Sequence, residues 1–371
     1  MTRRTASSGL RIGLNLLYLR PGIVGGTETY ARGLVDALDS AAPDHSFSVF
    51  LNRSAAAWPL PSRFTRVICS VSARQGRRYL YEQTRLPIQA TARKLDVLHS
   101  LAYVAPVMAR CASVVTVPDL NYRSPAHQMP LVRRLALSTF VNAAVRRCDA
   151  VIAISHFVAN EIREAMPFAT SKLHVVHLAP QERSAPPDLP RGSMQPAKPY
   201  FLAFSSTSAN KNLRRLLRAH AEARSGGMSH ALVVVGHRPP WPVENASEAQ
   251  WTGYLPEADV QALLRDADGL LFPSLYEGFG LPILEAMQAG VAVACSARAS
   301  LPEIAGDAAL YFDPENVGSI ADAMRTLASD PVLRADLADR GQKRAAQFNW
   351  RRTANETLTV YRMALGGRAR P

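Results

Sequence analysis

The stretch at residues 272–296, FPSLYEGFGLPILEAMQAGVAVACS, constrains the fold more than any other part of the sequence. It reads as the end of a buried strand, a turn containing Gly278 and Gly280, a helix over residues 282–288, and a second buried strand over residues 291–294. A strand, a glycine turn and a helix N-terminus together present a concave set of backbone N–H donors. The sequence therefore predicts donors that suit a diphosphate at this turn.

Two glutamates flank the turn. Glu277 precedes it, and Glu285 lies about one helical turn inside the helix, so both carboxylates can line the same cleft. Without further context, two such glutamates are more often an ordinary loop residue and a solvent-exposed helix residue than a binding site. Here the two glutamates flank a glycine turn between two apolar strands, which favours a binding site instead. Their carboxylates can accept hydrogen bonds from sugar hydroxyls beside the diphosphate donors. The pattern describes a nucleotide-sugar site.

The nine residues EGFGLPILE resemble the motif of two glutamates separated by seven residues in the retaining family-4 glycosyltransferases. The resemblance implies the α/β GT-B fold, with two Rossmann-like parallel-sheet domains that face each other across a cleft. It implies that Glu285 binds the ribose and that Glu277 binds the sugar, with a nucleophilic role for Glu277 left open. Further donor-binding candidates lie in the turn: Gly278, Phe279, Gly280 and Leu281. No metal and no cofactor are expected.

At 371 residues the chain is too long for one ordinary core, which favours two domains. Six prolines between residues 180 and 199 indicate a linker. We predict an N-terminal, acceptor-side domain at 1–183, a linker at 184–198 and a C-terminal, nucleotide-sugar-binding domain at 199–350. Residues 351–371 are expected to form a helix that crosses back to the first domain, as in GT-B proteins, with an irregular tail from Gly366.

Short apolar runs alternate with helical stretches, which indicates open, mostly parallel sheets with helices on both faces. In such sheets ligands bind beyond the carboxyl ends of the strands. Gly25 and Gly26 follow the first run and precede a helix at 28–38, so their backbone can approach a phosphate, although a plain loop fits equally well. In the first half the runs lie at 10–17, 47–51, 66–69, 96–99, 113–117 and 150–154.

His99 and Asp119 each follow one of these strands. A lone histidine at a strand end is more often structural than catalytic. The resemblance implies catalytic roles for both residues. The chain differs from the family at Pro118, where family members frequently have a histidine. Of that His-Asp pair, the resemblance therefore implies a role for Asp119 alone.

In the second half, Lys211 directly precedes a helix. An isolated lysine is usually a solvated charge, whereas the resemblance implies a catalytic Lys211 on the donor diphosphate. Ser206 stands in the region where many family members have a partner arginine, and it is a donor-binding candidate. The turn at Tyr254 is implied to hold the nucleobase through backbone groups. Asp266 and Asp268 spell a D-x-D pattern, which we assign to chance rather than to a metal site.

Charge is unevenly distributed. Residues 1–185 carry 23 Lys and Arg against 11 Asp and Glu, whereas residues 186–371 carry 20 against 19. A basic first half suits an acidic partner: anionic lipid headgroups, a diphosphate-linked acceptor or nucleic acid. The arginine-rich segments 74–85 and 133–147 can lie on an anionic membrane or be ordinary core-facing helices with arginine outer faces. No apolar run is long enough to span a membrane, so we expect a cytoplasmic protein, with peripheral contact at the inner membrane face left open.

The resemblance implies a retaining hexosyltransferase. It would move mannose or a similar hexose from a nucleotide-diphosphate sugar to a saccharide or polyprenyl-diphosphate-linked acceptor in surface polysaccharide assembly. The alternatives are another GT-B enzyme, such as a sugar-nucleotide epimerase or a phosphorylase, and a basic nucleic-acid-binding protein. The sequence contains no signature of a nucleic-acid-binding module, so nucleic acid is not an expected partner.

Overall fold

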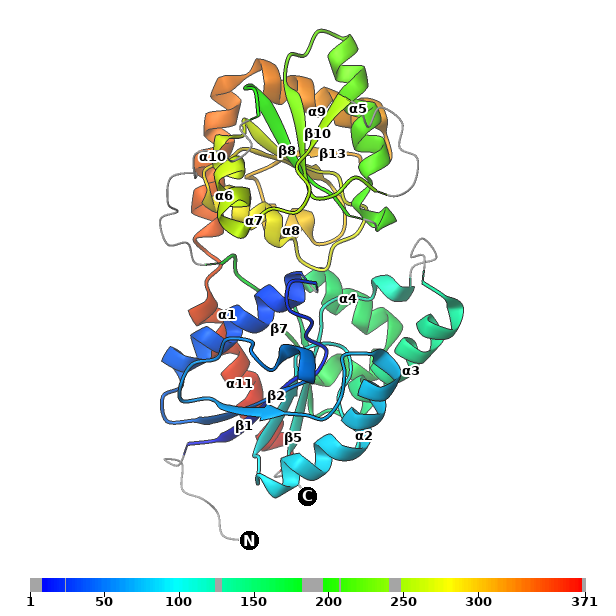
Figure 1. Ribbon diagram of the computed structural model, residues 1–371, viewed down its shortest axis with the longest axis vertical. Coiled ribbons are helices and arrows are strands. Elements are labelled where there is room, and N and C mark those ends of the chain that lie inside the picture. Colours follow the sequence, from blue (N-terminus) through cyan, green and yellow to red (C-terminus); the bar gives the residue numbers. More distant parts are fainter. Residues whose placement is uncertain are drawn as a thin grey trace. The chain divides into compact units, whose positions relative to one another are not determined.

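The computed structural model describes residues 9–23, 25–123, 129–181, 196–206, 208–239 and 248–368 (Figure 1). These residues form two compact units. The first contains the chain up to Arg123, Met129–Ala179 and the chain from Asn349 onward, and the second contains Pro180–Phe348. The predicted linker at 184–198 falls largely on residues 182–195, which lie outside the described residues. Among the described residues, none of the helices is both long and apolar enough to cross a membrane.

The first unit is built on a seven-stranded sheet in the order β3-β2-β1-β4-β5-β6-β7. Every pairing is parallel, as predicted. All residues of β4, β5 and β6 are buried, which is typical of parallel strands that are covered on both faces. The strands are β1 (Arg11–Leu16), β2 (Ser46–Leu51), β3 (Thr65–Ile68), β4 (Val97–Ser100), β5 (Ala112–Val117), β6 (Ala150–Ala153) and β7 (Leu173–Val175).

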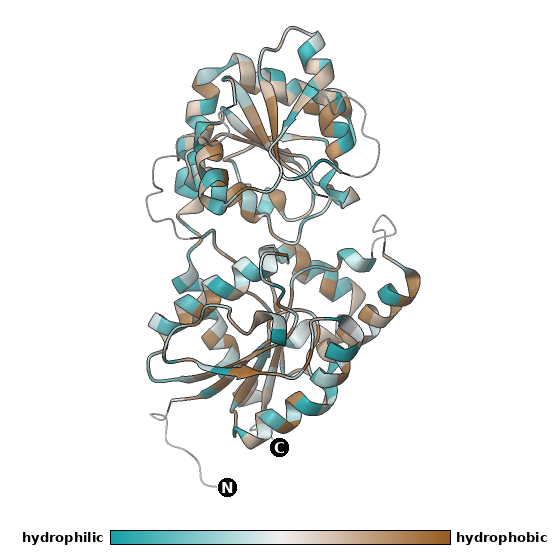
Figure 2. Cartoon of the chain, viewed as in Figure 1, coloured by the Kyte–Doolittle hydropathy of each residue, from teal (hydrophilic) through white to brown (hydrophobic). Residues whose placement is uncertain are grey.

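Helices cover this sheet, and their apolar sides face it. In Figure 2 the strands are mostly brown, whereas the helices carry both brown and teal residues. The Ser155 side chain accepts the Val158 N–H and caps α4. The helices are α1 (Gly26–Ala41), α2 (Gln75–Ala92), α3 (Leu131–Arg147), α4 (His156–Ala165) and α11 (Trp350–Arg368), with short 3₁₀ turns η1 (Arg53–Ala55), η2 (Asn121–Arg123) and η3 (Pro167–Lys172).

Helix α11 packs within the first unit, against α1 and the sheet. A Cβ placed on Gly33 of α1 would lie 2.0 Å from the Trp350 ring, so the glycine permits close approach of the two helices. The irregular tail predicted from Gly366 is wrong as far as Arg368, because α11 continues to that residue. The Arg368 guanidinium donates to the Asp149 carboxylate at 2.8 Å and to the Arg110 carbonyl at 2.8 Å, which holds this last turn.

The second unit has a six-stranded parallel sheet in the order β10-β9-β8-β11-β12-β13. Its core packs α5 and α9 against the sheet, with Phe201, Leu271 and Met324 at the centre. The strands are β8 (Tyr200–Phe204), β9 (Ala231–Val235), β10 (Ala249–Trp251), β11 (Gly269–Phe272), β12 (Val293–Ser296) and β13 (Leu310–Phe312). The helices are α5 (Leu213–Ser225), α6 (Glu257–Asp266), α7 (Leu281–Gln288), α8 (Leu301–Ala305), α9 (Val317–Ser329) and α10 (Pro331–Ala345), with a 3₁₀ turn η4 (Ala209–Lys211).

A buried carboxyl group in the first unit makes stability depend on pH. Glu82 of α2 is 2% exposed and accepts a 3.1 Å hydrogen bond from Asn15. Burial raises the pKa of Glu82 from its ordinary 4.5 to about 7, against the opposing effects of Arg78 and Asn15. Because the folded-state pKa lies above the unfolded one, the stabilisation is fully present below about pH 4.5 and is lost as the pH rises through about 7.

We therefore expect Glu82→Gln to flatten the fall in the free energy of unfolding between about pH 5 and pH 8. The amide imitates the protonated carboxyl group and keeps an oxygen that can accept from Asn15. Urea denaturation of both proteins across this range measures the slope. An unchanged slope in the variant would show that Glu82 does not titrate with folding.

Candidate active site

The second sheet changes strand order between β8 and β11. From β8 the chain continues to β9 on one side, and from β11 it continues to β12 on the other. The two loops at the carboxyl ends of β8 and β11 therefore lead to opposite sides, and such a switch point is where open α/β sheets bind ligands. The loop after β8 carries Lys211, and the loop after β11 carries Glu277.

Lys211 and Glu277 form an ion pair at this switch point. The Lys211 ammonium donates to Glu277 Oε1 at 2.5 Å, and the two side chains are 29% and 16% exposed. The ammonium also lies 5.2 Å from the centroid of the Phe272 ring, which adds a favourable cation–π contact. Both residues were predicted as site residues, and the structure brings them together. The pair supplies a positive charge and a carboxylate, both partly exposed.

Two asparagines on either side of Lys211 tie its loop to the loop of Glu277. The Asn210 carbonyl accepts the Leu275 N–H at 2.7 Å. The Asn212 side chain donates to the carbonyls of Pro273 and Pro314, at 3.1 and 2.6 Å. Asn212 has φ 57°, a left-handed conformation that asparagine tolerates better than most residues. The sequence analysis identified Lys211 but did not predict these supporting contacts.

The glycine turn after Glu277 leads into α7 as expected, although the helix begins at Leu281, one residue earlier than predicted. Gly280 occupies the N-cap position with φ 119°, which L-residues rarely adopt, and a Cβ there would lie 3.0 Å from a Leu301 methyl group. Gly280 has no side chain that could cap this helix. Pro282 has no N–H, and the Ile283 N–H donates to the Gly280 carbonyl at 3.0 Å, so the Leu281 amide is the first-turn donor suited to an anion.

Ser300 fixes the position of this turn and was missed by the sequence analysis. Its side chain is fully buried, and its hydroxyl lies 2.9 Å from the Glu277 carbonyl and 2.6 Å from the Phe279 carbonyl. No spacing in the sequence marks Ser300, because the contact joins two loops that are 21 or more residues apart.

The other donor-binding candidates of this unit lie in the segments that follow β8, β10 and β11. Glu285 is half-buried on α7, four residues after Leu281 and therefore on the same side of the helix. Ser206 accepts the Ser208 N–H at 3.1 Å. Tyr254 is 77% exposed, in a turn whose Gly253 exchanges backbone hydrogen bonds with Gly236. Their contacts with a donor stay predictions.

Comparison with known proteins decides the family. The family model described as "Glycosyl transferases group 1" matches residues 198–330, and the model described as "Glycosyltransferase Family 4" matches residues 24–179. The chain is a group 1 glycosyltransferase. A nucleic-acid-binding protein, one of the alternatives, is therefore not favoured.

Curated relatives of this glycosyltransferase include O-antigen chain mannosyltransferase B of Escherichia coli, 29% identical over 272 residues, which cover 68% of this chain and 70% of the relative. The MMP alpha-(1->4)-mannosyltransferase of Mycolicibacterium hassiacum is 27% identical over 249 residues, which cover 64% of this chain and 59% of the relative. Among solved structures, sucrose-phosphate synthase from Thermosynechococcus elongatus superposes with a TM-score of 0.74 at 17% identity, covering 95% and 98% of the two chains. The fold is GT-B, as predicted.

In the first unit of the glycosyltransferase, the predicted glycine turn leads directly into a helix. Gly25 is the N-cap of α1 with φ 54°, and Gly26 is the first helical residue, so α1 starts two residues before the predicted position. The Tyr18 hydroxyl donates to the Thr27 carbonyl at 3.0 Å and ties the preceding loop to the helix. A phosphate contact at this N-terminus stays a prediction.

The predicted catalytic role of His99 is wrong, because the residue has no exposed surface through which to contact a substrate. Its Nδ1 lies 2.7 Å from the Tyr361 hydroxyl, and its Nε2 lies 2.8 Å from the Thr116 hydroxyl. Burial lowers the pKa of His99 to about 3, so the ring is neutral at physiological pH. His99 therefore has a structural role: it connects α11 to the sheet through these two contacts.

Asp119, the other strand-end candidate, is half-buried beyond β5. Its carboxylate accepts the Tyr103 hydroxyl at 2.5 Å and the Asn121 N–H at 2.9 Å. These bonds hold the carboxylate at the carboxyl edge of the first sheet, which is where ligands of such sheets bind. A catalytic role for Asp119 stays a prediction.

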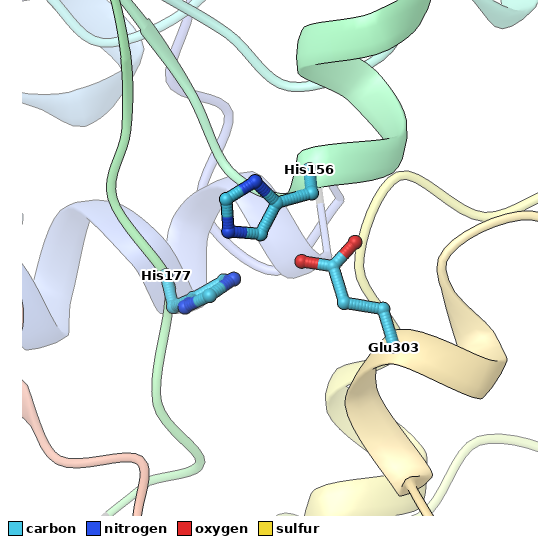
Figure 3. A group of neighbouring side chains, drawn as sticks. All are labelled: His156, His177 and Glu303. Carbon is cyan, nitrogen blue, oxygen red and sulfur yellow. The ribbon is translucent and has the colours of Figure 1, made fainter.

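Two histidines that the sequence analysis did not single out lie at the same edge. His156 begins α4 after β6, and His177 follows β7. Their rings lie edge to face with centroids 5.6 Å apart, and Figure 3 shows them beside each other. Glu303, also drawn there, belongs to α8 of the second unit. The two imidazoles alone supply fewer than the three or four protein ligands of a zinc site, so we assign no metal to them.

The D-x-D pattern lies at the other edge of the second sheet. Asp268 immediately precedes β11 and accepts the N–H of Tyr200, the first residue of β8. Asp266 pairs with Lys198 at 3.5 Å. Both carboxylates are therefore at the amino ends of the strands, away from Lys211, which agrees with the interpretation that the pattern is accidental.

Proposed function

We propose that this glycosyltransferase transfers mannose or a similar hexose, with retention of configuration, from a nucleoside-diphosphate sugar to a saccharide acceptor in surface polysaccharide assembly. The ion pair of Lys211 and Glu277 at the switch point of the second sheet carries the proposal. The names of the two mannosyltransferase relatives support the choice of sugar. The first unit would bind the acceptor, either a free saccharide or one linked to polyprenyl diphosphate, at the cytoplasmic face of the membrane.

The chemistry follows from the charges that develop during transfer. Breaking the bond between the anomeric carbon and the phosphate builds positive charge on the sugar and negative charge on the departing diphosphate. Lys211 would exchange Glu277 for the diphosphate, and the Leu281 amide at the start of α7 would add a hydrogen bond to it. Groups held in place where charge develops lower the barrier most. The positive charge would come from the protein, so we propose that no metal is required.

Release of Glu277 from Lys211 would leave its carboxylate free for the sugar hydroxyls near the reacting carbon. Glu285, on the same helix as the diphosphate-binding Leu281 amide, would bind the ribose hydroxyls. No dedicated base is needed if the departing phosphate takes the proton of the acceptor hydroxyl, which is attacked from the face that the phosphate leaves.

Titration calorimetry with nucleoside diphosphates and with oligonucleotides, each at two salt concentrations, tests the proposal. We expect saturable nucleotide binding that depends weakly on salt. Oligonucleotide binding with a steep salt dependence and no nucleotide binding would instead support a nucleic-acid-binding protein. A panel of GDP-, UDP- and dTDP-sugars then identifies the base and the sugar.

Glu285→Ala is expected to weaken nucleoside-diphosphate binding by about 10- to 100-fold, because hydrogen bonds to a charged group contribute roughly 1.5–3 kcal/mol. Transfer should fall with it, while the melting temperature stays close to that of the parent protein. The dissociation constant from the same calorimetric titration checks the result. If the variant binds nucleoside diphosphates as tightly as the parent protein, Glu285 does not contact the nucleotide.

A further inference from the structure

An apolar groove lies between α2 and α3 of the first unit, on helices that the proposed chemistry does not use. Its volume is about 730 Å³, within the range of small-ligand pockets. The rings of Tyr79 and Phe140 meet there with centroids 4.6 Å apart. The lining is mostly apolar, from Tyr79, Leu80, Pro130, Val132, Ala136 and Phe140.

Exposed apolar side chains lie on the two helices that form this groove. Leu80 is 66% exposed, Val132 81% and Leu135 58%. Together with Ile88 and Leu131, they make five of the twelve large apolar side chains that are exposed in the described part of the chain. Leu80 and Val132 line the groove itself, and the other three lie on the same two helices. Such a concentration on the helices that form the groove marks an interaction surface.

The charges around the groove have one sign. Arg77, Arg85 and Arg133 are exposed on the two helices. The sequence of α3 contains no acidic residue, and that of α2 contains only Glu82, which is buried. A partner with negative charge above an apolar layer complements this surface, and an anionic lipid bilayer has that composition. Nucleic acid matches the arginines but leaves the apolar side chains without a partner.

We propose that the α2–α3 groove docks on an anionic phospholipid bilayer. Leu80, Leu131 and Val132 enter the boundary between headgroups and acyl chains, and one lipid hydrocarbon chain occupies the groove. Arg133 and its neighbours contact lipid phosphates. The inference rests on the proposed function, since a lipid-linked acceptor would be presented at such a surface.

Co-sedimentation with vesicles tests the proposal, using phosphatidylcholine with and without phosphatidylglycerol. The full chain is expected to bind only the anionic vesicles. Val132→Asp should lower the partition coefficient about tenfold, because it removes a buried apolar side chain from the contact. Arg133→Gln should lower it about fivefold and reduce its salt dependence.

Val332→Asp is the matched control. Val332 is 77% exposed and is the second residue of α10, as Val132 is of α3, so an aspartate in either place meets a helix N-terminus favourably. The control should bind vesicles like the parent protein. Equal binding by both aspartate variants, or no binding of the parent to anionic vesicles, overturns the proposal.

Sedimentation velocity without vesicles tests whether a second copy of the chain, rather than lipid, occupies the groove. Self-association that Val132→Asp abolishes would identify the groove as an interface between two copies and would also overturn the lipid assignment. The nucleotide titration contains no lipid, so it separates failure of this proposal from failure of the proposed function.

Discussion

Lys211→Met is expected to lower the turnover number for sugar transfer by about 100- to 1000-fold at saturating donor, the range measured when one charge-stabilising donor is removed. The ammonium is the group that we expect to neutralise the departing diphosphate. The substitution also leaves Glu277, 16% exposed, without the partner that holds it at 2.5 Å. Initial rates over a series of donor concentrations separate the turnover number from donor affinity.

Lys343→Met is the control for this prediction. Lys343 pairs with Asp339 at 2.6 Å in the same unit, but both side chains are more than half exposed on α10. Exposed pairs of this kind contribute little to stability, so transfer should be unchanged. Lys211→Arg keeps the charge and should retain more activity than Lys211→Met. Turnover of Lys211→Met within threefold of the parent would mean that Lys211 does not act on the diphosphate.

Gly33→Ala is expected to destabilise the protein by about 3 kcal/mol, near the upper end of the usual cost of overpacking. The added methyl group would lie 2.0 Å from the ring of Trp350, which is 4% exposed. The two helices must separate, which weakens the attachment of α11. A drop in melting temperature on the order of 6–12 °C corresponds to this loss.

Gly366→Ala provides the comparison, since Gly366 lies on α11 and a Cβ there has nothing within 4 Å. That variant should be neutral or slightly stabilised, because alanine favours helix more than glycine does. If Gly33→Ala melts within about two degrees of the parent protein, the close approach of α1 and α11 is not important for stability.

The sequence predicted the architecture well because parallel strands are long apolar runs. The runs at 10–17, 113–117 and 150–154 each coincide with a strand to within two residues. The strands that were not foreseen, β7, β10 and β13, are three residues long, too short to show a pattern of their own. They lie at sheet edges, where neighbouring strands rather than local sequence determine pairing.

Site residues were predictable where the backbone needed a particular residue type. Gly280 could be identified because a positive φ at a strand-to-helix turn requires glycine. Lys211 and Glu277 were each identified, yet their pairing was not, since 66 residues separate them. Ser300 was missed for the same reason. Its function is to bind carbonyls of a distant loop, and a serine leaves no periodic signal.

His99 shows that a position at a strand end does not by itself predict whether a side chain is exposed. The rule for parallel sheets places the backbone of His99 at the ligand-binding edge, but exposure depends on what covers that edge. Tyr361, 262 residues later, covers the ring. Burial by a remote helix is a tertiary effect, and the structural interpretation of a lone histidine was correct here.

The attachment of α11 also affects how the chain matures on the ribosome. The residue that closes over His99 is synthesised after the whole second unit, so the first unit to emerge is the last to be completed. Until then, the surface that α11 covers on α1 and the central strands is open to water and to other nascent chains. A released chain that ends before Trp350 would therefore contain a complete second unit and an unfinished, aggregation-prone first one.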